Sequence, residues 1–591
     1  MGLSYTVDTP IRVAHYGISS VISIVDDELL EKMNAFYTSH FKLPFQEISQ
    51  KVQDYRAMRI TSYLNLVDQI VKRKFESFKT DLAENVQVLE QFIAMLPNTS
   101  ELKKKLEGYA STQTAKDKIR QFIDEHLRPG AIDVNIMTKV DKDNFDKDVK
   151  LPIEFNDAHA ALRGFAKSNL RSSIVLSAGM NPRLFGYFEQ FPDFFPDADG
   201  NFNKKIIIKV SDFRSAIIQG NYLAKKGLWV SEYRIESGLN CGGHAFASEG
   251  FLLGPILEEF MQNKDRLRSS SYELMVKALT IKGLPVPESE PEIKITVQGG
   301  VGTAGEHDFL LSQYKVDSVG WGSPFLLVPE ATSMDQKTRT LLANGKERDF
   351  YLSNMSPLGV PFNTIKGTTN EFFHQKRIHD QKPGSSCPKK LLALNTGPDG
   401  KGICTASRKY QERKLAELDR NVLSDVLYAK KARAITEKAC LCVGLANASY
   451  LENGIEIKGQ QQGVVVCPGP NLAYFDKEVS LSDMVRHIYG KTSVLSHNSR
   501  PHMFLKEIQL YIDYLRKEII ETDEPLPAQE KKWAAFRKNL HEGIQYYKEL
   551  LQRTGFGVSE IGQIMPQLTV SENELSQLDG LIGNSKFIKL A

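Results

Sequence analysis

The sequence lacks the features that mark membrane, exported and low-complexity proteins. No run of about 18 consecutive apolar residues occurs, so no segment is a candidate membrane span. Residues 1–12 contain no apolar stretch behind a basic segment, which argues against an export signal. Repeats at solenoid spacing and low-complexity tracts are also missing. We therefore expect a cytoplasmic protein that folds throughout its length and does not bind a membrane.

An excess of charge of one sign is missing too. Lys and Arg number 75 and Asp and Glu 72, so the net charge is only +3. This balance disfavours a nucleic-acid partner, because such proteins usually carry a strongly basic surface. At 591 residues the chain is too long for one ordinary core, so we expect more than one domain.

Cysteine is scarce, with six residues, yet five of them fall in one segment of the chain. In a reducing cytoplasm such clustering favours a metal or redox role over disulfides. Thiolates are typical ligands of iron–sulfur clusters, although the spacing matches no standard ferredoxin run. Structural zinc and unligated buried thiols are the alternatives. The candidate ligands are Cys387, Cys404, Cys440, Cys442 and Cys467.

The apolar and polar patterns alternate between strand and helix signals. Ile11–Ala14 reads as a first buried strand that opens into a loop at His15, and residues 27–128 then show helical periodicity up to Pro129-Gly130. Further strands are predicted at 132–137, 173–177, 205–210, 228–231, 293–297 and 318–321. Helices are predicted at 158–168, 214–226, 252–263, 271–281 and 306–314.

Short apolar strands followed by amphipathic helices predict βα units and a parallel sheet. Six or more units in series favour an α/β fold of the (β/α)8 barrel type, with a doubly wound open sheet as the alternative. The expected organisation is a first strand in 1–26, a helical insertion in 27–128 and the rest of the barrel in 129–345. A Gly-, Pro- and Cys-rich extension (346–470) and a helical module (471–591) follow.

Two glycine clusters follow apolar strands. Gly299 and Gly300 come after the strand at 293–297, and Gly322 and Ser323 come after the strand at 318–321. Glycine lets the backbone approach a ligand closely, and consecutive free amides at strand ends form phosphate cradles. Tight βα turns are the simpler explanation of either cluster alone. Two clusters on successive strands favour phosphate binding.

A third cluster, Gly242-Gly243-His244, follows the strand predicted at 228–231. An imidazole at this position could accept a proton near neutral pH. A single histidine after glycines is more often a loop hydrogen-bonding group. The order of the three clusters along the chain nevertheless makes His244 a candidate catalytic base.

In this order the clusters resemble those of the nitronate monooxygenases and the flavin-dependent enoyl reductases. The resemblance covers about residues 10–331 without the helical insertion, and more faintly 356–369. It implies counterparts of that family's flavin-contacting strand end, its Asn and its Lys, followed by its Gly-Gly-His motif and phosphate loops. In this sequence they are Ala14-His15-Tyr16, Asn135, Lys209, Gly242-Gly243-His244, Gly299-Gly300 and Gly322-Ser323.

The resemblance implies an FMN-dependent oxidoreductase acting on a small-molecule or acyl substrate, with His244 as base and Lys209 near the flavin. Ala14-His15-Tyr16 departs from the family's Ala-Pro-Met, and nothing in the family accounts for the final third of the chain. One alternative is a flavin and iron–sulfur reductase that relays electrons from a partner protein. A barrel scaffold with a mainly binding role is the other.

Overall fold

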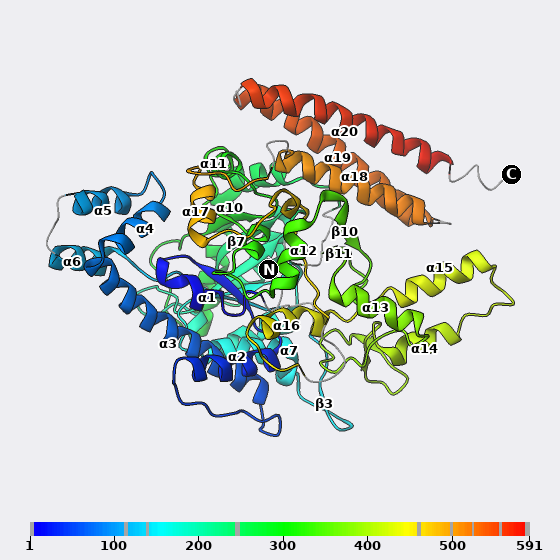
Figure 1. Cartoon of the computed structure of the whole chain (residues 1–591), viewed down its shortest axis with the longest axis horizontal. Coiled ribbons are helices and arrows are strands. Elements are labelled where there is room, and N and C mark those ends of the chain that lie inside the picture. The colour runs from blue at the N-terminus through cyan, green and yellow to red at the C-terminus, as the bar shows by residue number, and fades with distance from the viewer. Residues whose placement is uncertain are drawn as a thin grey trace.

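The fold was taken from a computed structural model of the whole chain (Figure 1). It describes residues 5–111, 116–136, 141–240, 242, 249–457, 463–496, 500–522, 525–554 and 558–584. Among these residues, no helix combines the length and the apolar character that a membrane span needs.

Seven parallel strands form the central sheet, in the order β1-β2-β5-β6-β7-β8-β9. They are β1 (Ser20–Ser23), β2 (Ile132–Ile136), β5 (Ser173–Leu176), β6 (Lys205–Val210), β7 (Val230–Glu236), β8 (Lys294–Gln298) and β9 (Ser318–Gly320). Strand order follows chain order without reversal, as in a barrel and unlike a doubly wound sheet. Within the described residues β9 does not pair with β1, so the sheet curls without closing. The expected eighth strand is not among the described elements.

Helices cover the outer face of this sheet. The helices that follow β2, β5, β6, β7 and β8 are α7 (Asp157–Ala166), α8 (Pro182–Tyr187), α9 (Phe213–Ala224), α10 (Leu253–Lys282) and α11 (Ala304–Gln313). The two helices predicted at 252–263 and 271–281 are one continuous helix, α10. Strand β7 runs to Glu236, five residues beyond the predicted end, because its charged residues alternate with apolar ones and hide the strand signal.

The first predicted strand is wrong. Ile11–Ala14 belongs to the short helix α1 (Thr9–Val13) and the 3₁₀ turn η1 (Ala14–Tyr16), and β1 begins only at Ser20. Pro10 at the start of α1 suits a helix N-terminus, where a missing N–H costs nothing. A four-residue apolar run cannot by itself distinguish a strand from a helix turn.

Apart from the loop at 41–54 and short connections, the described residues of 27–128 are helical, in agreement with their periodicity. The helices are α2 (Asp27–His40), α3 (Tyr55–Glu84), α4 (Val86–Met95), α5 (Glu101–Ser111) and α6 (Lys116–His126). Helices α2 and α3 are not a separate insertion, since Leu30, Ile60 and Leu64 share the main core with the sheet. The far end of α3 and α4–α6 form a smaller core of their own and project to one side (Figure 1).

The segment after β9 contains short elements packed around a second core. It holds α12 (Gln336–Asn344), β10 (Phe350–Ser353), β11 (Phe362–Ile365), α13 (Thr369–His379), β12 (Asn395–Thr396), β13 (Gly402–Ile403), α14 (Arg408–Ala416), α15 (Asp425–Thr436) and α16 (Leu441–Glu452). A hairpin of β3 (Phe145–Asp146) and β4 (Val149–Lys150) lies between β2 and α7. The chain ends in α17 (Leu481–Ile488), α18 (Met503–Glu521), α19 (Pro527–Thr554) and α20 (Val558–Asn584).

The last three helices pack together beside the sheet (Figure 1). Their apolar residues, among them Ile512, Leu540 and Leu568, belong to the same core as the barrel strands and α10. The amphipathic faces predicted for this region are therefore buried against the barrel helices as well as against one another.

Candidate active site

Polar side chains line the inner face of the curled sheet. On β7, Tyr233 and Ile235 are buried among the outer helices, so strand alternation directs Glu232, Arg234 and Glu236 to the inside. The pairing register places Lys209 beside Arg234, and Gln298 beside Glu236, on this same inner face. The lumen is therefore built to receive polar groups.

The carboxyl ends of β6, β7 and β8 carry a connected group of polar residues. Glu236 Oε1 accepts hydrogen bonds from Gln298 Nε2 (2.6 Å) and Asn240 Nδ2 (2.7 Å). Lys209 Nζ lies 3.4 Å from the same oxygen, in an ion pair about one fifth exposed. Glu236 thus holds Lys209 at the strand edge where ligands of parallel α/β folds usually bind.

Asn135 lies at the carboxyl end of β2, on the same inner face. Its Nδ2 donates to Ser23 Oγ on β1 (3.1 Å). Its Oδ1 is buried and has no hydrogen-bond partner among the described residues. A buried acceptor without a donor is costly, so this oxygen is available for the N–H of a bound molecule.

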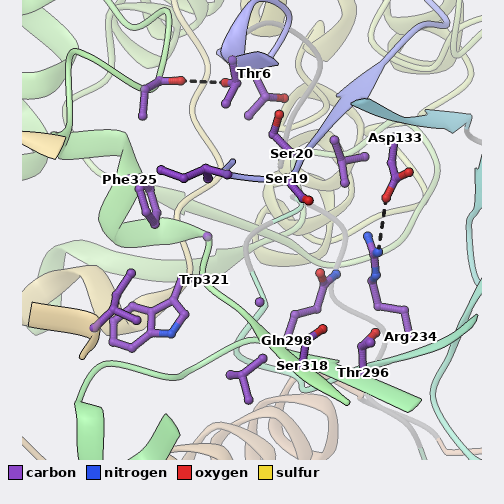
Figure 2. Close-up of a pocket in the computed structure, with 18 of the residues that line it drawn as sticks. Thr6, Ser19, Ser20, Asp133, Arg234, Thr296, Gln298, Ser318, Trp321 and Phe325 are labelled. Atoms are coloured by element: carbon purple, nitrogen blue, oxygen red, sulfur yellow. Dashed lines mark hydrogen bonds and ion pairs between the residues drawn. The ribbon is translucent and has the colours of Figure 1, made fainter. Parts of the chain in front are cut away.

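Deeper in the lumen lies a charged trio, of which Figure 2 shows Asp133 and Arg234. Arg234 donates to Glu232 (2.8 Å), and its guanidinium lies 3.9 Å from Asp133 on β2. Thr296 Oγ1 also donates to Glu232 (2.6 Å). Burial raises the pKa of Asp133, and the nearby Arg234 opposes this shift. Arg234 compensates only part of the negative charge of Glu232 and Asp133, and the three side chains keep the lower lumen polar.

A cavity of about 470 Å³ runs along the gap between β1 and β9. This volume lies within the usual range for small-molecule sites, roughly 300–1,000 Å³. Figure 2 shows Asp133, Arg234, Thr296, Gln298 and Ser318 directed toward it. Its other polar lining residues include Ser19, Ser20, Asn240, His307 and Thr332, and its rim includes Gly320, Trp321 and Gly322.

Gly320 and Gly322 of the loop after β9 line this rim, and the glycines after β8 directly follow Gln298, which also lines the cavity. Gly299 (φ 107°) and Gly300 (φ 83°) have left-handed backbones and pack against Leu239 and Asn240 of the loop after β7. Ser323 Oγ accepts from Gly469 N (2.8 Å). Within the described part of the chain, the amides of Gly300, Gly322 and Ser323 donate no hydrogen bond. These amides could therefore receive an anion.

The residues expected beneath the flavin lie elsewhere. Because η1 precedes β1, Ala14, His15 and Tyr16 are not at the carboxyl end of a strand. His15 and Tyr16 pack on Phe78 of α3, with ring centroids 5.6 Å and 5.0 Å away. Burial lowers the pKa of His15 to about 3. The reason for predicting flavin contacts at these three positions is thus removed.

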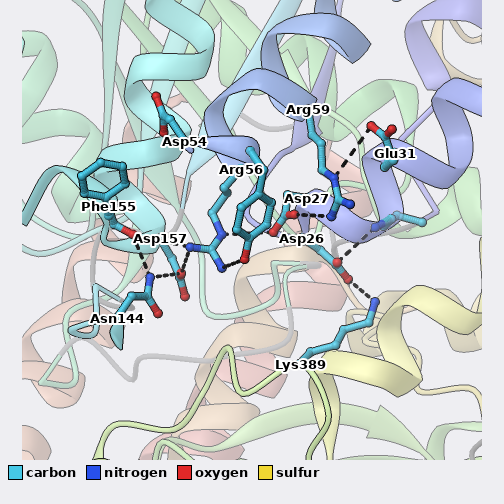
Figure 3. Close-up of polar contacts among 12 residues, drawn as sticks. Asp26, Asp27, Glu31, Asp54, Arg56, Arg59, Asn144, Phe155, Asp157 and Lys389 are labelled. Carbon is cyan, nitrogen blue, oxygen red and sulfur yellow. Dashed lines mark hydrogen bonds and ion pairs between the residues drawn. The ribbon is translucent and has the colours of Figure 1, made fainter. Parts of the chain in front are cut away.

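The carboxyl end of β1 is instead followed by two aspartates (Figure 3). Asp27 pairs with Arg56 (3.0 Å) and Arg59 (2.9 Å) of α3. Asp26 pairs with Lys389 of the cysteine-rich extension. These ion pairs join the start of α2 to α3 and to the extension, which is a structural role.

The predicted base, His244, and Gly243 lie outside the described residues. Gly242 is described and exposed. The catalytic role of His244 and the cofactor-binding role of Gly242 and Gly243 therefore stay predictions from the sequence. These residues belong to the segment that follows β7, which ends at Glu236, six residues before Gly242.

The five clustered cysteines are buried and form no disulfide within the described part of the chain. The Cys387 and Cys404 thiols contact each other, and burial raises the pKa of the Cys440 and Cys442 thiols. Cys467 contacts the Tyr5 hydroxyl instead. Within the described ranges, no group of three or more His, Cys, Asp or Glu side chains is arranged to hold a metal ion. The structure thus gives no support to the expected iron–sulfur or zinc site.

Sequence reasoning missed Glu236, Arg234, Asp133 and Asn240. The detectable signal was the alternation of Glu232, Arg234 and Glu236 with Tyr233 and Ile235, which is the two-residue period of a strand with one polar face. The strand predicted at 228–231 stops short of this alternation.

The inner face fits a flavin mononucleotide in three respects. Asn135 offers an unsatisfied acceptor, Lys209 offers a cation at a strand end, and the rim offers amides without partners. A flavin ring carries an N–H donor and carbonyl acceptors, and its phosphate is an anion suited to such amides.

Comparison with known proteins identifies no family for this chain. No protein-family model and no curated protein match it. Among solved structures, it is similar to a mutant of FabK from Thermotoga maritima, at 10% identity over 67% of this chain and 82% of that chain, with a TM-score of 0.29. It is also similar to the enoyl reductase domain of MlnA from the macrolactin biosynthesis cluster of Bacillus amyloliquefaciens, at 16% identity over 74% and 94%, with a TM-score of 0.33. Neither score is high enough to carry an argument about the fold or activity of this chain.

Proposed function

We propose that this chain is an FMN-dependent oxidoreductase of the nitronate monooxygenase or enoyl reductase type, acting on a small-molecule or acyl substrate. One observation carries the proposal. Asn135 and Lys209 lie at the carboxyl ends of β2 and β6. Glu236, the ion-pair partner of Lys209, bonds to Gln298 and Asn240, which line the cavity together with Gly320 and Gly322 of the loop after β9. When bound, FMN would supply the electron transfer, which no side chain of the lumen can provide.

The residues of the lumen have distinct tasks in this proposal. Lys209 places a positive charge where the bound ring gains electrons, and Glu236 fixes the position of its ammonium group. An ammonium group has three donors, so this ion pair leaves donors for a ligand. Asn135 Oδ1 orients the ring by accepting from it. His244, in the loop after β7, is assigned the proton transfer to or from the substrate.

The polar lumen and its cavity favour this function over a purely structural barrel. A purely structural barrel has no need of charged side chains beside an interior cavity, because burying charged groups costs stability. We do not extend the proposal to iron–sulfur chemistry, since no metal-holding group is present among the described residues.

The test is flavin binding by the full chain, with Lys209→Met as the variant. We expect the purified protein to show flavin absorption bands, or to bind added FMN as measured by fluorescence quenching. Losing a charge-assisted contact should weaken FMN binding by about tenfold or more in Lys209→Met.

Lys205→Met is the matched control, because Lys205 lies at the other end of the same strand and is exposed. It should bind FMN like the wild-type chain. A wild-type chain that binds no flavin would overturn the proposal and favour the scaffold alternative. Equal losses in the two lysine variants would refute the role of Lys209.

A further inference from the structure

The phosphate loop proposed after β8 is held from outside by three side chains of the C-terminal part of the chain. Arg500 Nη2 donates to Gly300 O (2.7 Å), and Asn471 Nδ2 donates to Val301 O (3.0 Å). His487 Nε2 lies 3.0 Å from Gly302 O. Three successive carbonyls thus each receive one side-chain contact. We call Asn471, His487 and Arg500 the latch.

The latch is itself anchored by a buried ion pair. Arg500 Nη1 lies 2.6 Å from Glu306 Oε1, and the two side chains are 5% and 2% exposed. Glu306 also accepts from the amides of Met503 (2.7 Å) and Gly302 (2.9 Å). Burial alone would raise the pKa of Glu306, but Arg500 and these hydrogen bonds hold it below its usual value.

Arg500 and Asn471 also bond to each other, through Arg500 Nε and Asn471 Oδ1 (2.6 Å). The space for the latch exists because residue 302 is glycine. A Cβ at Gly302 would lie 2.7 Å from Arg500 Nε and 2.8 Å from Asn471 Nδ2. The loop and the latch are therefore fitted to each other at this residue.

These contacts determine which way the loop amides point. In a planar trans peptide, the C=O and N–H groups point in opposite directions. With the carbonyls of Gly300 and Gly302 turned to the latch, the amides of Val301 and Thr303 are turned away from it. Neither amide donates a hydrogen bond within the described part of the chain.

We infer that Arg500, Asn471 and His487 are positioning residues that hold the loop 300–303 with the amides of Val301 and Thr303 free for a phosphate group. The inference rests on the proposed function, and it gives the C-terminal segment a role in cofactor binding. The latch does not touch the reacting atoms. It restricts the backbone conformation of the loop in the unbound chain, so less conformational entropy is lost when the phosphate group binds.

The test compares FMN with riboflavin, which lacks the phosphate. The main variant is the double substitution Arg500→Met with Glu306→Gln, because Arg500→Met alone would leave a buried unpaired carboxylate and threaten folding. Arg486→Met is the matched control, since Arg486 lies on α17 with 40% of its side chain exposed and its carboxylate partner 3.8 Å away. Circular dichroism checks that each variant is folded.

We expect the wild-type chain to prefer FMN over riboflavin. The double variant should lose about tenfold or more of its FMN affinity while its riboflavin affinity changes little, and Arg486→Met should behave like the wild-type chain. A general structural defect would weaken both ligands together and would refute the inference. An unchanged preference for FMN in the double variant would refute it as well. If the wild-type chain binds neither FMN nor riboflavin, the proposed function is refuted, and the inference that rests on it is refuted with it.

Discussion

Glu507 on α18 is a carboxylate buried at the loop that follows β7. It accepts from Ser237 Oγ (2.9 Å), Leu253 N (2.9 Å) and Gly238 N (3.3 Å). Burial nevertheless raises its pKa from 4.5 to about 7, because the hydrogen bonds from described residues offset only part of the cost of burying the charge. Glu507 therefore links α18 to the segment that follows β7, and burying its charge lowers the stability of the folded chain.

The raised pKa predicts a pH dependence of stability. Between the unfolded pKa, 4.5, and the folded value, about 7, the folded chain binds the extra proton, so this contribution to stability falls as pH rises through that window. From about pH 5.5 to 8 the loss should be roughly 2 kcal/mol. Urea unfolding at both pH values measures it.

Glu507→Gln is the comparison for this prediction. The variant should lose this part of the pH dependence of stability. Its free energy of unfolding should also be lower at every pH, because the NH₂ group of Gln would face the N–H of Leu253, and both groups are donors. An identical pH slope in the variant and the wild-type chain would show that the carboxylate does not titrate as expected.

At the scale of elements, the N-terminus of α10 packs closely against α19. Gly254 N donates to Tyr547 Oη (2.9 Å), and a Cβ at Gly254 would lie 2.9 Å from Tyr314 Oη and closer still to the Tyr547 ring. Only glycine permits this approach of the two helices. By contrast, Gly108 on α5 has no heavy atom within 4 Å of its Cβ position.

These two glycines predict opposite effects of the same substitution. Gly254→Ala should lower the free energy of unfolding by about 1–3 kcal/mol through overpacking. Gly108→Ala should raise it by roughly 0.5–1 kcal/mol, because alanine loses less backbone entropy in a helix. Denaturant unfolding of both variants is the measurement. A stabilised Gly254→Ala would mean that α10 and α19 do not pack as described.

At the scale of the molecule, one apolar core joins the barrel to the C-terminal helices. It contains Trp229, next to β7, and Trp533, on α19. A shared core predicts that the two regions unfold together. The third tryptophan, Trp321, lines the cavity rim.

Single-tryptophan variants test this cooperativity. One keeps Trp229 and the other keeps Trp533, with the remaining tryptophans replaced by Phe. In each variant, the denaturant midpoint from fluorescence should equal the midpoint from far-ultraviolet circular dichroism, because one transition carries both signals. A fluorescence midpoint for Trp533 well below its circular dichroism midpoint would show that the C-terminal helices unfold separately.

Much of the fold was determined by local sequence patterns. The helical period of 27–128 and of the last helices, and the apolar strands at 173–177, 205–210 and 293–297, agree with the structure to within a residue or two at each strand end. Such patterns suffice because a helix or strand must bury one face whatever its partner is. The glycines after β8 and β9 were also recognisable, since their positions at strand ends follow from chain order.

Tertiary structure decided the rest. The four residues at 11–14 are equally compatible with a strand and a helix turn, and packing on α3 selected the helix. The pairing of Lys209 with Glu236, and of Arg500 with Glu306, joins residues 27 and 194 positions apart, which no periodicity reveals. The sequence by itself determined the elements and the glycine loops. Only the tertiary structure decided which charges meet, because burial and distance are properties of the packed chain.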